Sequence, residues 1–186
     1  MNVGDQKVLH SLSEGIAKKW LAARLALTEG IFGLESIEIM KITDVLRAEH
    51  AVFHNLFDHI EASVPRLETV GEVKLLATLV DKVMAPHSKT EDDLFIEPLE
   101  HCFEQIGQNE TFHAEHRRIE EMLAQVQKAR TLEDAKKILL GAIAASRDHF
   151  DREERIVFPM AERILKAKTL SDLGKEWLCK RQAALK

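Results

Sequence analysis

The residues best suited to chemistry in this chain form two His-x-x-x-Glu motifs, His87 to Glu91 and His149 to Glu153. Residues four apart lie on the same face of an α-helix, so each motif directs one imidazole and one carboxylate the same way. Imidazole nitrogen and carboxylate oxygen are ligands for iron, manganese and zinc. Each motif therefore predicts half of a metal site.

Each motif is preceded by an Ala-Glu-His triplet, which ends at His50 in the first case and at His116 in the second. The two triplets are 66 residues apart and the two motifs are 62 residues apart, so the chain repeats one arrangement. We interpret the repeat as two helical hairpins related by a pseudo-twofold axis, which brings all the candidate ligands to a similar level. The candidate metal ligands are His50, His87, Glu91, His116, His149 and Glu153. This six-ligand set predicts a site for two metal ions.

Apolar residues recur around these ligands at the three-and-four spacing of a buried helix face. The pattern predicts four helices, at about 43–64, 70–104, 109–129 and 132–167. The start of the second is marked by the capping box Thr69 to Glu72, and Thr131 gives a similar signal for the fourth. Short connections favour antiparallel neighbours. We expect an all-α, up-down four-helix bundle over 40–168, a helical N-terminal extension over 1–39 and a short C-terminal helix over 169–186.

His and Glu interrupt the buried faces of these predicted helices. In the fourth helix the predicted buried face comprises Ile138, Ala142, Ala145, His149, Glu153, Ile156 and Met160. A carboxylate buried without a partner is costly, and two at one level would be costlier. A bound cation between them removes that cost, which favours a metal centre over a plain bundle.

Composition limits the other functions. Hydrophobic residues make up 45% of the 186-residue chain, enough for a core, and the net charge of −5 with no basic face argues against nucleic acid. The two cysteines, Cys102 and Cys179, show no paired spacing and suggest a reducing compartment, so we expect a cytoplasmic protein. No apolar run reaches the length of a membrane span. An amphipathic stretch within 1–39 suggests a surface for a homodimer or another partner.

The motifs resemble those of the hemerythrin-like, or HHE cation-binding, family over about residues 43–165. The family is a four-helix bundle with a non-haem di-iron centre. The resemblance implies that the four histidines are terminal ligands and that Glu91 and Glu153 bridge two iron ions, with an oxo or hydroxo group as a third bridge. Manganese or zinc are expected substitutes. It also implies binding of, or reaction with, O2, NO or peroxide.

One position departs from the oxygen-carrying members of that family, which have a second histidine on the third helix. Here the residue four before His116 is Phe112. Fewer histidines leave more coordination positions for water or a small ligand, which favours sensing, stress response or iron handling over oxygen transport. Two alternatives stay open, a sensory or interaction module driven by the metal state and a simple iron store.

Several flanking residues have two interpretations. His54 and His113 lie within one turn of candidate ligands, and we favour a non-ligand role for both. Asp92 and Glu154 follow the candidate bridging acids and either hydrogen-bond the ligand imidazoles or form an ordinary charged flank. Glu49 and Glu115 are rotated by about 100° from the ligand face, and we expect them at the surface.

Overall fold

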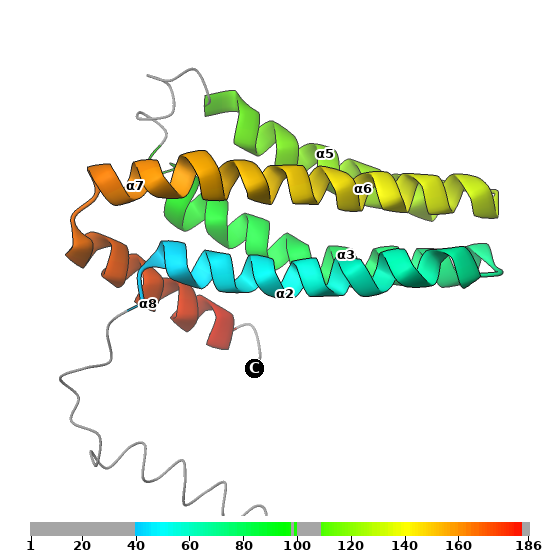
Figure 1. Ribbon diagram of the computed structural model, residues 1–186, viewed down its shortest axis with the longest axis horizontal. Helices are drawn as coiled ribbons and strands as arrows, with labels where there is room; N and C mark the ends of the chain where they lie inside the picture. The colour runs from blue at the N-terminus through cyan, green and yellow to red at the C-terminus, as the bar shows by residue number, and fades with distance from the viewer. Residues whose placement is uncertain (1–39, 98, 100–108, 184–186) are drawn as a thin grey trace, which may run out of the picture. The chain divides into compact units, whose positions relative to one another are not determined.

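The computed structural model describes residues 40–97, 99 and 109–183, and within this part of the chain it is helical, without strands. The main helices are α2 (Ile42–Ser63), α3 (Val70–Glu91), α5 (Asn109–Lys128) and α6 (Leu132–Arg152). They lie side by side and alternate in direction, with α2 and α5 running one way and α3 and α6 the other (Figure 1). The predicted all-α, antiparallel four-helix bundle is confirmed. The predicted extension over 1–39 lies outside the described residues.

The helices start where the sequence indicates. Thr69 caps α3, since its hydroxyl accepts from the Glu72 amide at 3.3 Å and its own amide donates to the Glu72 carboxylate at 2.8 Å. Thr131 caps α6 by accepting from the Asp134 amide at 3.1 Å. Each hairpin closes through a short connection. The first, between α2 and α3, consists of η1 (Val64–Arg66) and the residues that follow it, and the second, between α5 and α6, is a turn at 129–131. These caps satisfy amides that would otherwise lack partners at the helix ends.

Both hairpins end in a wider helical turn. The π-helical segments η2 (Asp92–Ile96) and η3 (Glu153–Val157) continue α3 and α6, and η3 leads into α7 (Phe158–Ile164). A π turn takes up more residues than an α turn and delays the buried face by about one residue. The prediction that Ile156 is buried is therefore wrong: it is 43% exposed, and Val157 and Phe158 are buried in its place.

The apolar core falls into two clusters along the bundle. One, the upper cluster, contains among other residues Phe53, Phe57, Val80, Ile119, Leu139 and Phe150. The lower cluster contains Leu46, Phe95, Phe112, Val157, Phe158 and Trp177, among others. Along each main helix, the candidate ligand residues lie between the residues of the upper cluster and those of the lower cluster. The six candidate ligands therefore form a polar layer between two apolar ones.

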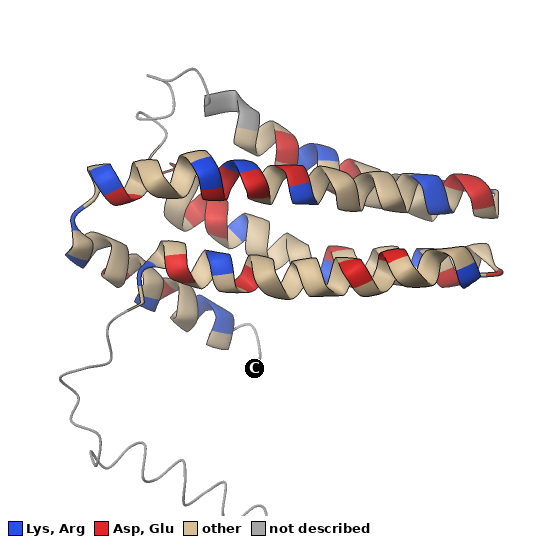
Figure 2. Cartoon of the chain, in the orientation of Figure 1, with Lys and Arg blue, Asp and Glu red and all other residues tan. Residues whose placement is uncertain are grey.

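A further helix, α8 (Ala167–Ala183), packs beside the start of α2 at the end of the bundle that holds the lower cluster (Figure 1). Acidic and basic residues are both spread along the main helices of the bundle (Figure 2). None of the described helices combines the length and apolar character that crossing a bilayer requires.

Candidate metal centre

The six predicted ligands lie together in the interior of the bundle. His50, His87, Glu91 and Glu153 have no exposed surface, and His116 and His149 are 4% and 2% exposed. They come from all four main helices and the first residue of η3. Two groups of their side chains, Glu91–His116–His149–Glu153 and His50–His87–Glu91, each place one ligand atom per residue within 4.8 Å of the others. Glu91 belongs to both groups, as a residue shared by two neighbouring ions would.

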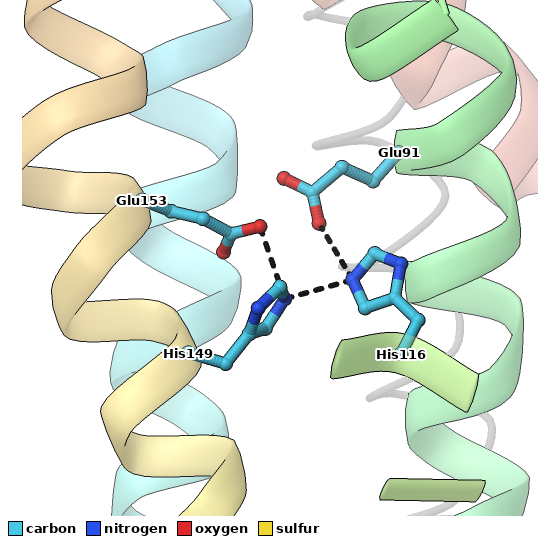
Figure 3. Close-up of side chains that lie close together, drawn as sticks. All are labelled: Glu91, His116, His149 and Glu153. Atoms are coloured by element: carbon cyan, nitrogen blue, oxygen red, sulfur yellow. Dashed lines mark hydrogen bonds and ion pairs between the residues drawn. The ribbon is translucent and has the colours of Figure 1, made fainter. Parts of the chain in front are cut away.

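Each glutamate lies between two imidazoles from different hairpins. Glu153 places one oxygen 3.0 Å from His149 Nε2 and the other 3.4 Å from His50 Nε2. Glu91 Oε2 is 3.5 Å from His87 Nε2 and 3.8 Å from His116 Nε2. Figure 3 shows Glu91 and Glu153 facing each other across the bundle above His116 and His149. The two carboxylates thus obey the pseudo-twofold relation of the sequence repeat.

The outer nitrogen of every imidazole meets a carboxylate from a different helical segment. These pairs are His50 with Glu154 at 3.0 Å, His87 with Glu49 at 2.8 Å, His116 with Asp92 at 3.1 Å and His149 with Glu115 at 2.9 Å. In each case the Nδ1–H donates to a carboxylate oxygen, which turns Nε2 towards the interior. Such partners fix the tautomer and orientation of metal-binding histidines.

Two of these partners agree with the sequence interpretation and two correct it. Asp92 and Glu154 hydrogen-bond imidazoles, the first of the two roles considered. The prediction that Glu49 and Glu115 lie at the surface is wrong, because each is half-buried and hydrogen-bonded to a histidine of the neighbouring helix. A rotation of about 100° from the ligand face directs a side chain at the next helix of the bundle rather than at water. The acid immediately before a ligand histidine is the sequence signal for this role.

Burial and mutual charge set the ionisation of the two glutamates. Burial raises the pKa of Glu91 well above its ordinary value, and the charge of Glu153 raises it further. Burial also acts to raise the pKa of Glu153, but the nearby charge of His149 outweighs burial and lowers this pKa to about 2. In the metal-free protein one carboxylate is thus ionised and the other holds a proton. Two cations would allow both to ionise.

The imidazoles show the same competition. Burial lowers the pKa of His50 to about 3, against the opposing charge of Glu153. Burial acts to lower the pKa of His149, but the nearby charge of Glu153 outweighs burial and raises this pKa above its ordinary value. The Nε2 atoms of His116 and His149 are 2.7 Å apart, a contact that needs a proton on one of them. A metal ion bound there would displace that proton.

Among the residues that the structure describes, nearly all buried side-chain nitrogen and oxygen atoms without a hydrogen-bond partner belong to this centre. They include both oxygens of Glu91, both oxygens of Glu153 and the Nε2 atoms of His50 and His87. Buried polar atoms are seldom left unpaired, and several unpaired atoms facing one interior point to an ion. Nitrogen and oxygen donors without a thiolate suit iron or manganese. The residues present therefore fit a metal centre of the kind that the sequence predicted.

The other residues weighed as ligands lie outside the two groups. His54 is half-buried, and its Nδ1 accepts from the Arg147 guanidinium at 2.9 Å, directed away from the centre. His113 is half-buried and pairs with the Asp92 carboxylate at 3.0 Å, so it supports the partner of His116. Phe112 fills the place of a second histidine on α5 and is completely buried.

Comparisons with known proteins agree with this geometry. The family model described as the hemerythrin HHE cation-binding domain matches residues 41–161 and again residues 107–175, so the second hairpin is matched twice. No curated protein and no solved structure matched the chain. The first match alone covers more than half of the sequence and includes every candidate ligand. This chain therefore belongs to the hemerythrin HHE cation-binding domain family.

Proposed function

We propose that this protein holds two non-haem iron ions and binds or reacts with O2, NO or peroxide, in sensing, stress response or iron handling. The main support is the set of buried carboxylate oxygens and imidazole nitrogens that have no hydrogen-bond partner and lie together inside the bundle. Six inward ligands suit two ions better than one, because Glu91 belongs to both groups of ligand atoms.

The chain would divide its ligands evenly between the ions. His50 and His87 would serve one ion, His116 and His149 the other, and Glu91 and Glu153 would lie between the two ions. Bound iron would supply redox chemistry and open coordination positions for a small ligand. The protein's own contribution is to hold the imidazoles at fixed angles through the four outer carboxylates.

The surroundings favour chemistry in a dry pocket. The Phe150 ring stacks on His50 with centroids 4.1 Å apart, and Phe158 lies on the same ring at 5.7 Å. Both phenylalanines are completely buried, so they exclude water from that side of the centre. Phe112 is completely buried and stands four residues before His116, where the resemblance to oxygen carriers would place a further histidine. A four-histidine centre keeps more positions open, which supports ligand sensing or reaction over reversible oxygen transport.

The test is metal analysis with an absorption spectrum after anaerobic loading with Fe2+ and re-oxidation. We expect about two iron ions per chain and near-ultraviolet charge-transfer bands after oxidation. The double variant Glu91→Ala, Glu153→Ala should lose the second ion. Glu120→Ala is the matched control, since Glu120 is an exposed glutamate one turn after His116. Unchanged stoichiometry in the double variant would contradict the assignment of the bridges.

The same experiment separates the alternative functions. Iron binding with no spectral change on exposure to O2, NO or peroxide would favour the simple iron store. Manganese or zinc uptake at the same stoichiometry would show that these metals substitute.

We also propose that residues 1–39 form a separate extension that mediates homodimerisation of a cytoplasmic protein. The amphipathic stretch in 1–39 is the basis for the homodimer. The unpaired spacing of the two cysteines is the basis for the cytoplasmic location. A chain lacking 1–39 should then keep its iron spectrum and lose the dimer. A dimer that survives the deletion would refute this part of the proposal.

A further inference from the structure

The outer carboxylates of the two hairpins are held by different parts of the chain. Glu115, which bonds His149, forms an ion pair with Arg152 of the same hairpin. In the first hairpin the position 62 residues before Arg152 is Thr90, whose hydroxyl instead donates to the Pro86 carbonyl at 2.7 Å. The pseudo-twofold symmetry of the centre is therefore broken at this position.

The helix α8 supplies the missing support. Glu49, which bonds His87, accepts at one oxygen from the Trp177 indole N–H and from the Arg181 Nε–H, both at 2.9 Å. Its other oxygen accepts from Arg181 Nη2 at 2.8 Å and from His87 Nδ1 at 2.8 Å. A guanidinium that donates two parallel hydrogen bonds fixes the plane of a carboxylate as well as its position. The orientation of Glu49, and through it that of His87, thus depends on α8.

Trp177 adds a direct contact with the same histidine. Its ring meets His87 edge to face with centroids 5.5 Å apart, and the Arg181 guanidinium lies 4.7 Å above the Trp177 ring. Trp177 has no exposed surface, whereas the Arg181 side chain is 22% exposed. Beyond them Glu49, Val52 and Arg181 help to line a cavity of about 500 Å³. If α8 moved away, Glu49 would lose its donors on the side nearest this opening.

A close approach of two backbones places α8 where it can do this. A Cβ atom added at Gly174 would lie 2.2 Å from the Met40 carbonyl oxygen and 3.1 Å from the Ile42 amide nitrogen. Backbone atoms cannot turn aside as a side chain does, so only glycine permits this contact. Leu170 and Trp177 pack in the lower cluster on either side of it along α8.

We propose that α8 completes one half of the metal centre, with Trp177 and Arg181 as positioning residues that fix His87 through Glu49. The half of the centre at His50 and His87 then binds its metal ion with full affinity only when α8 is packed against α2. The half at His116 and His149 carries its own support in Arg152. This inference rests on the proposed function, because it concerns the same two ions.

The expected effect is selective for one ion. Loss of an outer partner of a metal-binding histidine lowers metal affinity by about 10- to 100-fold. Arg181→Gln, which loosens that partner, should therefore weaken one of two Fe2+ binding steps by up to that factor and leave the other unchanged. Trp177→Phe, which keeps a buried aromatic ring and loses the N–H donor, should weaken the same step.

The experiment is an anaerobic Fe2+ titration of the full-length chain against a chelating indicator. In a Trp20→Phe background, Trp177 is the only tryptophan, and quenching of its emission by Fe2+ identifies the step at His87. Arg181→Gln should shift that quenching step to higher Fe2+ concentration. Arg152→Gln should shift the other step instead. Glu176→Gln, at an exposed position of α8, should shift neither.

Gly174→Ala tests the docking of α8 without touching a hydrogen-bonding residue. It should weaken the same step as Arg181→Gln, because the added methyl group pushes α8 away from α2. A merely structural role for α8 would move both steps equally or lower the urea midpoint alone. Two unshifted steps in Arg181→Gln, or an equal shift of both, would refute the inference. A wild-type chain that binds no Fe2+ would refute the proposed function instead.

Discussion

The buried carboxyl group of Glu91 makes a contribution to the stability of the metal-free protein that depends on pH in a defined direction. Burial and the charge of Glu153 raise the pKa of Glu91 in the folded state, whereas the unfolded chain has an ordinary carboxyl pKa of 4.5. Above that value the unfolded chain releases a proton that the folded chain retains. The contribution of Glu91 to the free energy of unfolding is therefore fully present at low pH and is lost as the pH rises towards its folded pKa.

The size of the effect follows from proton linkage. Between the unfolded pKa of 4.5 and the raised folded pKa of Glu91, each pH unit lowers the free energy of unfolding by about 1.4 kcal/mol. Glutamine is a neutral mimic of the protonated acid and has no such slope. The metal-free Glu91→Gln variant should therefore gain about 1.4 kcal/mol relative to the wild type for each pH unit in the window. With iron the order should reverse, because a ligand at 100 times its dissociation constant stabilises by about 2.7 kcal/mol per site.

The assay is urea unfolding of both proteins between pH 5 and pH 8, with a chelator and then with saturating Fe2+ under anaerobic conditions. Glu120→Gln is the control, because Glu120 is exposed and its neutralisation should leave the slope unchanged. Parallel stability curves for the metal-free wild type and Glu91→Gln would refute the conclusion that burial holds a proton on Glu91. A metal-bound Glu91→Gln variant as stable as the metal-bound wild type would refute its role in binding the ions.

Three further substitutions test other parts of the centre. Glu115→Gln should lower the affinity for one Fe2+ ion by about 10- to 100-fold, since it weakens the support of His149, and an unshifted titration would contradict this role. Phe150→Ala removes a fully buried ring stacked on His50, so urea unfolding should show a loss of about 3–5 kcal/mol, and a loss below about 1 kcal/mol would show that the ring is not tightly packed. Phe112→His should destabilise the metal-free protein by about 1–3 kcal/mol, because it buries an unpaired imidazole. Iron should restore the stability of Phe112→His if the new ring reaches an ion, and continued destabilisation at saturating Fe2+ would exclude that contact.

The sequence alone was enough to predict the fold and the location of the six candidate ligands. Helix starts at Thr69 and Thr131 depend on residues three positions away, and the shared face of His87 and Glu91 depends on residues four positions away. Patterns of this kind can be read from the sequence because they depend only on residues within one turn of a helix. The repeat then placed the ligands at one level, because hairpins of similar length align equivalent positions.

The sequence pattern failed where a π turn changed the helical phase. Ile156 continues the three-and-four spacing, yet the wider turn at η3 rotates it into solvent. Periodicity assumes a constant rotation per residue, so it cannot detect a change in that rotation.

Tertiary structure alone decided which groups support the ligands. Glu49 and Glu115 look like surface acids on their own helices, and only the neighbouring helices make them partners of His87 and His149. Trp177 and Arg181 contact Glu49 from 128 and 132 residues away. Contacts across such a separation depend on how whole helices pack, whereas the ligand motifs depend on the geometry of a single turn. The chain's local spacing thus determined which side chains can meet in the candidate centre, and the packing of α8 against α2 decided which groups hold Glu49 beside His87.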